Sequence, residues 1–109
     1  MTNEETEHLV EVAPAAAISQ AWSQLEERVA AAAAGAGVTQ KLLPEVLRAL
    51  VEKGMIQPTA TDAILGLRNM RNLAMHAPPK RLTSEQAREF ITMAEAMMWT
   101  LEQNLRSAS

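Results

Sequence analysis

The sequence contains no cysteine and no tyrosine, and it has a single phenylalanine among 109 residues. The absence of cysteine excludes disulfides, thiolate metal ligands and cysteine nucleophiles, and it suits the reducing cytosol, so we expect a cytoplasmic protein. Few aromatic residues are present to build a β-sheet, whereas the helix formers alanine, leucine, glutamate, glutamine and methionine are abundant. The composition therefore predicts an all-α protein.

Long hydrophobic runs are absent as well. The uncharged stretch at residues 29–40 is mostly alanine and glycine, and the N-terminus is acidic where a signal peptide would be basic. We therefore expect neither a membrane span nor a signal peptide. The length is close to the commonest domain size, which predicts one domain.

Charge is segregated along the chain. Residues 1–27 hold six acids and no lysine or arginine, residues 28–81 hold eight lysines and arginines against three acids, and residues 82–109 return to a net charge of −2. The overall net charge of −3 argues mildly against a nucleic-acid partner. The basic middle, however, could attract an anion locally.

Apolar periodicity and helix breakers divide the chain into a lead-in and a helical domain. Residues 1–13 are rich in glutamate, and we interpret them as a solvated lead-in or short helix without chemistry. Residues 14–107 form the domain. Its expected helices cover residues 14–35, 42–53, 59–77 and a last segment that opens after Thr83.

Local signals support these helix limits. Pro14 and Pro44 suit a first helical turn, glycines suit the ends of the first two helices, and Thr83 with Gln86 forms a capping box. Trp22 lies on the apolar stripe of its helix and is predicted to be core. Trp99 lies opposite Phe90, so we expect it either under the N-terminal segment or exposed at an interface.

The helix predicted at residues 59–77 carries an anomaly. On a helical wheel Arg68, Asn72 and His76 align as one polar ridge, at i, i+4 and i+8. Arg71 instead falls within the apolar arc, where a guanidinium is unfavourable unless it meets a carboxylate, a phosphate or another subunit.

Two interpretations of this segment remain open. In the structural one, Arg71 bonds a carbonyl or an acid such as Glu26 or Glu27, and His76 favours the helix C-terminus for its dipole. In the chemical one, a histidine moves protons and arginines bind a phosphoryl centre, the minimum for metal-free RNA cleavage. The residues that would carry out this chemistry are Arg68, Arg71, Asn72 and His76, followed by Lys80 and Arg81.

One difficulty faces the chemical interpretation. Arg71 and His76 are five residues apart, about 140° around a regular helix, so one helix would not direct both at one atom. Either the helix end is distorted before Pro78, or a second copy of the chain completes the site.

The string Arg71-Asn72-Leu73-Ala74-Met75-His76 resembles the Arg-x4–6-His signature of the HEPN superfamily (higher eukaryotes and prokaryotes nucleotide-binding domains). Its setting is similar too, over about residues 14–106. The matching features are a Trp-Leu-Glu pattern at Trp22, Leu25 and Glu26, a leucine-rich second helix closed at Gly54, the lead Leu67-Arg68-Asn69, and a Thr-capped last helix. The chain looks like the bacterial branch that is classed among domains of unknown function.

The resemblance implies a four-to-five-helix, up-and-down bundle that forms a homodimer with the two motifs facing one another. It also implies a metal-independent endoribonuclease site that acts through the RNA 2′-hydroxyl. Here the catalytic residues would be Arg71 and His76 with Asn72 as a polar helper, and Arg68, Lys80 and Arg81 would bind the RNA or nucleotide.

The alternative is a non-catalytic helical dimerisation or interaction module that links a partner protein to a larger or defence-related system. A small-molecule or metal enzyme has little support, because there is no Gly-rich phosphate loop, no paired-carboxylate spacing and no ligand cluster. We therefore expect no cofactor and no metal.

Overall fold

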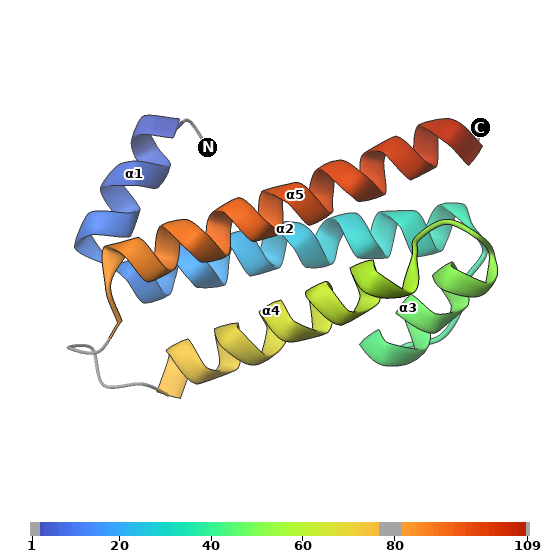
Figure 1. Ribbon diagram of the computed structural model, residues 1–109, viewed down its shortest axis with the longest axis horizontal. Coiled ribbons are helices and arrows are strands. Elements are labelled where there is room, and N and C mark those ends of the chain that lie inside the picture. The colour runs from blue at the N-terminus through green and yellow to red at the C-terminus, as the bar shows by residue number, and fades with distance from the viewer. Residues whose placement is uncertain (1–2, 77–81, 109) are drawn as a thin grey trace.

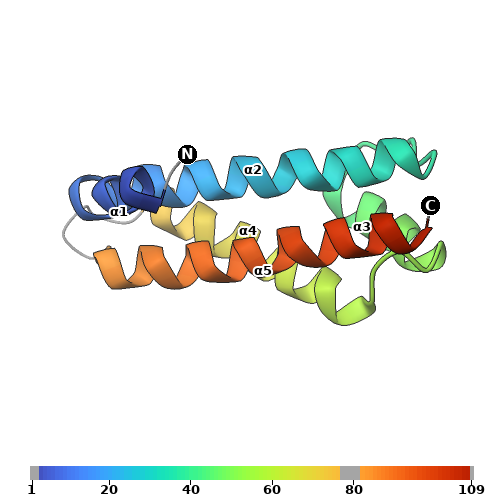
Figure 2. The same ribbon diagram turned by 90° about the horizontal axis from the view of Figure 1, so that it is seen from above.

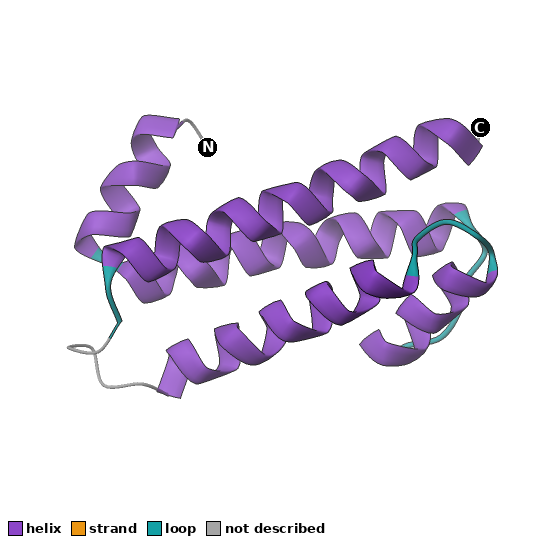
Figure 3. Ribbon diagram, in the orientation of Figure 1, coloured by secondary structure: helices purple, strands orange, loops and turns teal. Residues whose placement is uncertain are grey.

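The computed structural model describes residues 3–76 and 82–108, with the side chains of residues 4–76 and 82–103. The described parts contain five helices and no strand (Figure 3). The helices are α1 (Asn3–Val12), α2 (Pro14–Gly35), α3 (Leu43–Glu52), α4 (Pro58–His76) and α5 (Ser84–Ala108). The prediction of an all-α bundle is confirmed.

Three long helices build the body of the bundle (Figure 1). α2 and α5 run side by side in the same direction and share the most extensive contact, while α4 runs the opposite way and packs on both (Figure 2). The short α3 packs on α4 at the end of the bundle where α5 finishes. As a result, the C-terminal end of α4 lies at the same end of the bundle as the start of α5.

The core lies between these three helices. Ile18, Trp22, Leu25 and Val29 of α2 are all buried, as their spacing predicted. Phe90 of α5 is fully buried among them. Because this apolar stripe is continuous, α2 can bury one face along most of its length.

The predicted helix ends are confirmed in detail. Pro14 opens α2, and Gly37 takes a positive φ of 73° while the Val38 N–H bonds the Ala33 carbonyl at 2.9 Å. Gly54 ends α3 in the same way, with a φ of 74° and a bond from the Met55 N–H to Leu50. Glycine is required at these two turns because other residues rarely adopt positive φ.

The capping box before α5 is also present. The Gln86 N–H bonds Thr83 Oγ1 at 3.1 Å, and the Thr83 N–H bonds Gln86 Oε1 at 2.9 Å. These reciprocal bonds satisfy two N–H groups that have no partner within the helix. They fix where α5 begins.

Two expectations for α4 need correction. The helix was predicted from residue 59 but begins at Pro58, and the Gln57 carbonyl accepts the N–H groups of Ala60 and Thr61. Proline suits this first turn, since it has no N–H to leave unpaired. The apolar arc is also only partly core: Ile64, Leu67 and Ala74 are buried, whereas Met70, Leu73 and Met75 are exposed.

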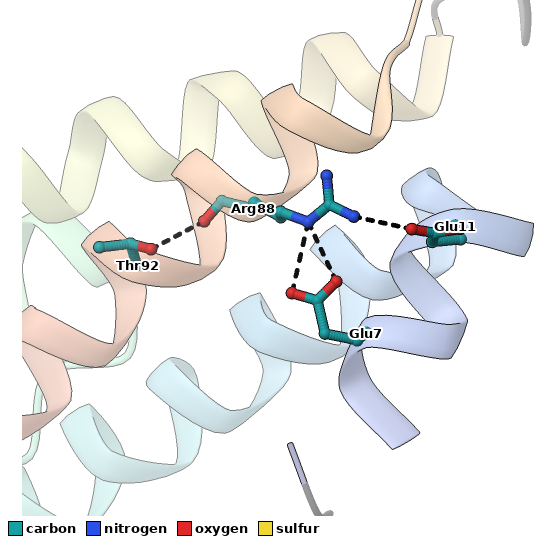
Figure 4. A network of polar contacts seen from close by, with 4 residues as sticks. All are labelled: Glu7, Glu11, Arg88 and Thr92. Carbon is teal, nitrogen blue, oxygen red and sulfur yellow. Dashed lines mark hydrogen bonds and ion pairs between the residues drawn. The ribbon is translucent and has the colours of Figure 1, made fainter. Parts of the chain in front are cut away.

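The acidic lead-in forms α1, which packs across α2 and α5. Val10 is buried in the core, so this segment is not wholly solvated. Arg88 of α5 joins Glu7 through Nε at 3.0 Å and Glu11 through Nη2 at 3.0 Å (Figure 4). The buried Val10, the partly buried Leu9 and the ionic contacts of Arg88 thus all help to hold α1 on the bundle.

The two alternatives for Trp99 can now be distinguished. Trp99 is 63% exposed on α5, so it does not lie under the N-terminal segment. Met98 is buried and Met97 packs against the core at partial exposure. Within the described residues, no helix is both long enough and apolar enough to cross a membrane.

Candidate anion site on α4

The candidate site occupies the C-terminal half of α4. This half lies against α2 on one side and beside the first turns of α5 on another. Its side chains divide into an arginine that packs toward the core, a polar ridge that is open to solvent, and an exposed apolar strip.

Arg71 is the side chain that packs inward. It is partly buried, and its guanidinium carbon lies 5.9 Å from the centre of the Trp22 ring, over the ring face. A guanidinium over an aromatic face at this distance is a cation–π contact. The anomaly in the sequence therefore has a partial physical explanation, since Trp22 supplies a surface that tolerates a cation.

No carboxylate among the described side chains forms an ion pair with Arg71. The sequence had offered Glu26 and Glu27 as partners, but neither makes this contact. Moreover, Arg71 Nε is buried and has no hydrogen-bond partner. A buried donor left unpaired costs about 1–3 kcal/mol, so an arginine held in this state is an unusual structural choice.

The polar ridge lies on the open side of α4. Arg68 is partly buried, whereas Asn72 and His76 are exposed, and His76 is the last helical residue. His76 lies in the last turn, as predicted, where the helix dipole stabilises a positive charge.

One chain does not bring Arg71 and His76 to a common point. α4 remains α-helical through His76, so the distortion considered from the sequence is not found within this helix. A separation of five residues then keeps the two side chains about 140° apart around the axis. Arg71 accordingly faces Trp22, while His76 faces solvent.

Two predicted binding residues, Lys80 and Arg81, lie outside the described residues. The described part of the chain contains no group of three or more His, Cys, Asp or Glu side chains that could hold a metal ion.

An apolar groove runs next to the site, between α4 and α5. It has a volume of about 310 Å³, and its lining includes Met70, Leu73 and Leu82 above Phe90. Leu73 is 71% exposed and Met70 is 41% exposed, so both offer apolar surface to solvent at its edge. Met93 of α5 is also exposed, and it lies one helical turn after Glu89 of the groove lining, so it shares that face of α5.

Two contacts are absent from the sequence prediction, that of Arg71 with Trp22 and that of Arg88 with α1. Trp22 was assigned to the core alone, because nothing in the spacing of one helix shows that a residue of another helix stacks on it. The contact of Arg88 with α1 was also missed. Its signal was available in the sequence, since Glu7 and Glu11 share one face of a helix at i and i+4.

Comparison with known proteins assigns the chain to a family but does not assign an activity. Residues 4–105 match the sequence profile of a family described as "Domain of unknown function (DUF4145)". No curated protein and no solved structure matches the chain.

Proposed function

The chain belongs to the DUF4145 family, and we propose that it binds RNA through the Arg71 segment of α4 and cleaves it without a metal ion. The HEPN-like signature Arg71 to His76 supports this proposal, as does the state of Arg71. The observation that carries most weight is that no described carboxylate neutralises Arg71 and that its buried Nε lacks a partner.

A phosphate would supply what Arg71 lacks. The guanidinium matches phosphate oxygens geometrically, and a charged hydrogen bond is roughly twice as strong as a neutral one. Arg68 and Asn72 lie one turn apart on the same helix and can contact the neighbouring backbone of the RNA. Lys80 and Arg81 follow in the chain and add positive charge to the same segment.

The proposed reaction is transesterification. The RNA 2′-hydroxyl attacks the adjacent phosphorus, a general base removes its proton, and the 5′-oxygen leaves with a proton from a general acid. The products are a 2′,3′-cyclic phosphate and a free 5′-hydroxyl. His76 is the proton-transfer group, because imidazole can take or give a proton near neutral pH. Arg71 stabilises the phosphorane-like transition state.

A homodimer would solve the separation of Arg71 and His76 in one chain. Two copies supply two His76 side chains, one as base and one as acid, and each can face the Arg71 of the other copy. The apolar strip formed by Met70, Leu73 and Met93 is a candidate contact, since exposed contiguous apolar surface is typical of interfaces. We therefore place the dimer interface on α4 and α5.

The test combines mass and activity on the same samples. Light scattering gives the solution mass of wild type, Arg71→Ala, His76→Ala and Leu73→Glu, and labelled single-stranded RNA is incubated with each in EDTA. We expect a wild-type dimer that cuts RNA, inactive dimers for Arg71→Ala and His76→Ala, and an inactive monomer for Leu73→Glu. RNA that stays intact with wild type, or is cut equally well by His76→Ala, contradicts the cleavage proposal.

The second candidate is a non-catalytic dimerisation or interaction module. The observation that favours it is the same exposed apolar strip on α4 and α5, which can bind a partner without any catalysis. In this case Arg71 and His76 would serve as polar contacts within the interface. Loss of the dimer in Arg71→Ala and His76→Ala, together with no effect of wild type on RNA, would favour this module.

A further inference from the structure

The apolar groove between α4 and α5 has a protruding side chain at its own edge. Its volume is about 310 Å³, which is large enough for an aliphatic side chain, and most of its lining is apolar. Leu73 lies at this edge and is 71% exposed. In a two-fold contact the same surface patch serves both copies, so a patch that carries a groove beside a protruding leucine can pair with itself. This self-complementarity favours a second copy of the chain as the occupant of the groove.

Two exposed side chains beside the groove are chemically complementary. Glu89 lines the groove on α5, and His76 follows Leu73 by one helical turn on α4. No ion pair joins Glu89 or His76 to another described side chain. A carboxylate and an imidazole on one patch can therefore pair across a two-fold axis, in the same way as the leucine and the groove.

The helix directions predict which residues would meet. When Leu73 of each copy enters the groove of the other, with the two-fold axis across α4, the axis passes close to Leu73 and α4 of the partner runs opposite to α4. The partner's His76 then lies one turn beyond the partner's Leu73, toward Met70 of the first copy. α5 also runs opposite to α4, so Glu89, almost one turn after Gln86, lies toward Met70 as well (Figure 1). Glu89 and the partner's His76 thus reach the same level of the interface.

We propose that the groove receives Leu73 of the partner subunit and that Glu89 then accepts a hydrogen bond from the partner's His76, as a positioning residue. This inference rests on the proposed function, in which a homodimer builds the site. The same register brings the partner's His76 level with Arg71 along α4, as that function requires. A carboxylate on one imidazole nitrogen fixes the ring and its tautomer, and the other nitrogen is left to exchange a proton with the RNA.

The first test joins the two residues covalently between copies. The chain has no cysteine, so His76→Cys and Glu89→Cys each carry a single thiol, and a disulfide between the two variants forms only between two molecules. Their equimolar mixture is oxidised with glutathione and analysed by intact mass. We expect the mixed disulfide to exceed both symmetric ones several-fold. The control mixture pairs His76→Cys with Arg48→Cys, an exposed position on α3, and should give little mixed disulfide.

The second test observes the imidazole directly. The chain has two histidines, so His8→Gln leaves His76 as the single histidine in ring ¹H–¹⁵N spectra. A carboxylate that accepts from one nitrogen keeps the proton there, so one tautomer of the neutral ring should dominate. Glu89→Ala, and Leu73→Ser without the protruding leucine, should each give a mixture of tautomers. Glu85→Ala removes an equal charge from the first turn of α5 and should leave the tautomer ratio unchanged.

The outcomes separate this inference from the proposed function. If wild type is a dimer but the mixed disulfide is no more abundant than with Arg48→Cys, or Glu89→Ala leaves the tautomer ratio unchanged, the inference is wrong and the copies pair in another way. If both tests succeed but wild type cuts no RNA, the contact is confirmed and the cleavage proposal falls. If wild type is a monomer, the dimeric site and this inference are both wrong.

Discussion

Two arginines show how differently this small bundle treats a positive charge. Arg88 bridges α5 and α1, where it bonds the carboxylates of Glu7 and Glu11. Arg71 lies between α4 and α2, where its guanidinium makes a cation–π contact with Trp22 and has no described carboxylate partner. Both arginines are partly buried, but Arg88 has two carboxylate partners, whereas Arg71 has none among the described side chains and its buried Nε is unpaired.

The difference separates a structural role from a chemical one. The hydrogen bond to Glu7 raises the pKa of Arg88 above its ordinary value, because the carboxylate favours the charged form of this guanidinium. The carboxylates of Glu7 and Glu11 already neutralise its charge within the chain. No described carboxylate neutralises the charge of Arg71, although its partial burial makes an unpaired charge more costly. An arginine in that state is the one that we expect to bind a ligand.

The largest effect expected from this contrast is on RNA cleavage. Arg71→Ala should lower the cleavage rate by about 100-fold or more, the usual loss when one donor to the transition state is removed. Arg88→Ala, the matched control on the other side of the bundle, should cleave as wild type does. The measurement is the single-turnover rate on labelled RNA in EDTA. Equal losses in the two variants would mean that position 71 has no special role.

The next effect concerns stability at the contact of α1. Val10 is the one fully buried side chain among those described in α1, and replacement by alanine should lower the free energy of unfolding by about 2 kcal/mol. Urea denaturation followed by circular dichroism measures this change. Glu4→Ala, on the exposed part of the same helix, is the control and should have little effect. If Val10→Ala unfolds at the same urea concentration as wild type, α1 is not part of the cooperative unit.

The sequence predicted most of the fold, because the signals that determine these helices are local. Pro14, Gly37, Gly54 and the Thr83–Gln86 pair each act on the backbone within a few residues of themselves. The exposure of Leu73 could not be predicted in the same way. Its wheel position is apolar, but whether an apolar face is covered depends on where the other helices pack, which one helix cannot reveal.

The same limit applies to the candidate site. That Arg71 was anomalous followed from its position in an apolar arc, but its partner was predicted to be a carboxylate and is an aromatic ring instead. Contacts between α2 and α4 join residues about fifty positions apart. The roles of Arg71 and His76 stay predictions, since they depend on a second copy and on an RNA.

A smaller effect tests whether Arg71 is costly to the free fold. Arg71→Met keeps a long, flexible side chain against Trp22 and removes the unpaired buried donor. We expect the free energy of unfolding to rise by about 1 kcal/mol while RNA binding weakens. Urea denaturation and an RNA binding titration on the same preparation measure the two changes. A variant less stable than wild type would show that Arg71 already has a stabilising partner, and the argument for a ligand would weaken.

The smallest effect is expected at Arg88. Its ion pairs with Glu7 and Glu11 are between exposed side chains, so solvent and salt screen them strongly, and most of the hold on α1 should come from Val10. Amide hydrogen exchange is sensitive enough to detect the change, because α1 can open without unfolding of the whole chain. Arg88→Ala should speed exchange in α1 slightly at low salt and leave α4 unchanged, and high salt should remove the difference from wild type. A difference that persists at high salt would show that Arg88 acts through the packing of its aliphatic stem and not through its charge.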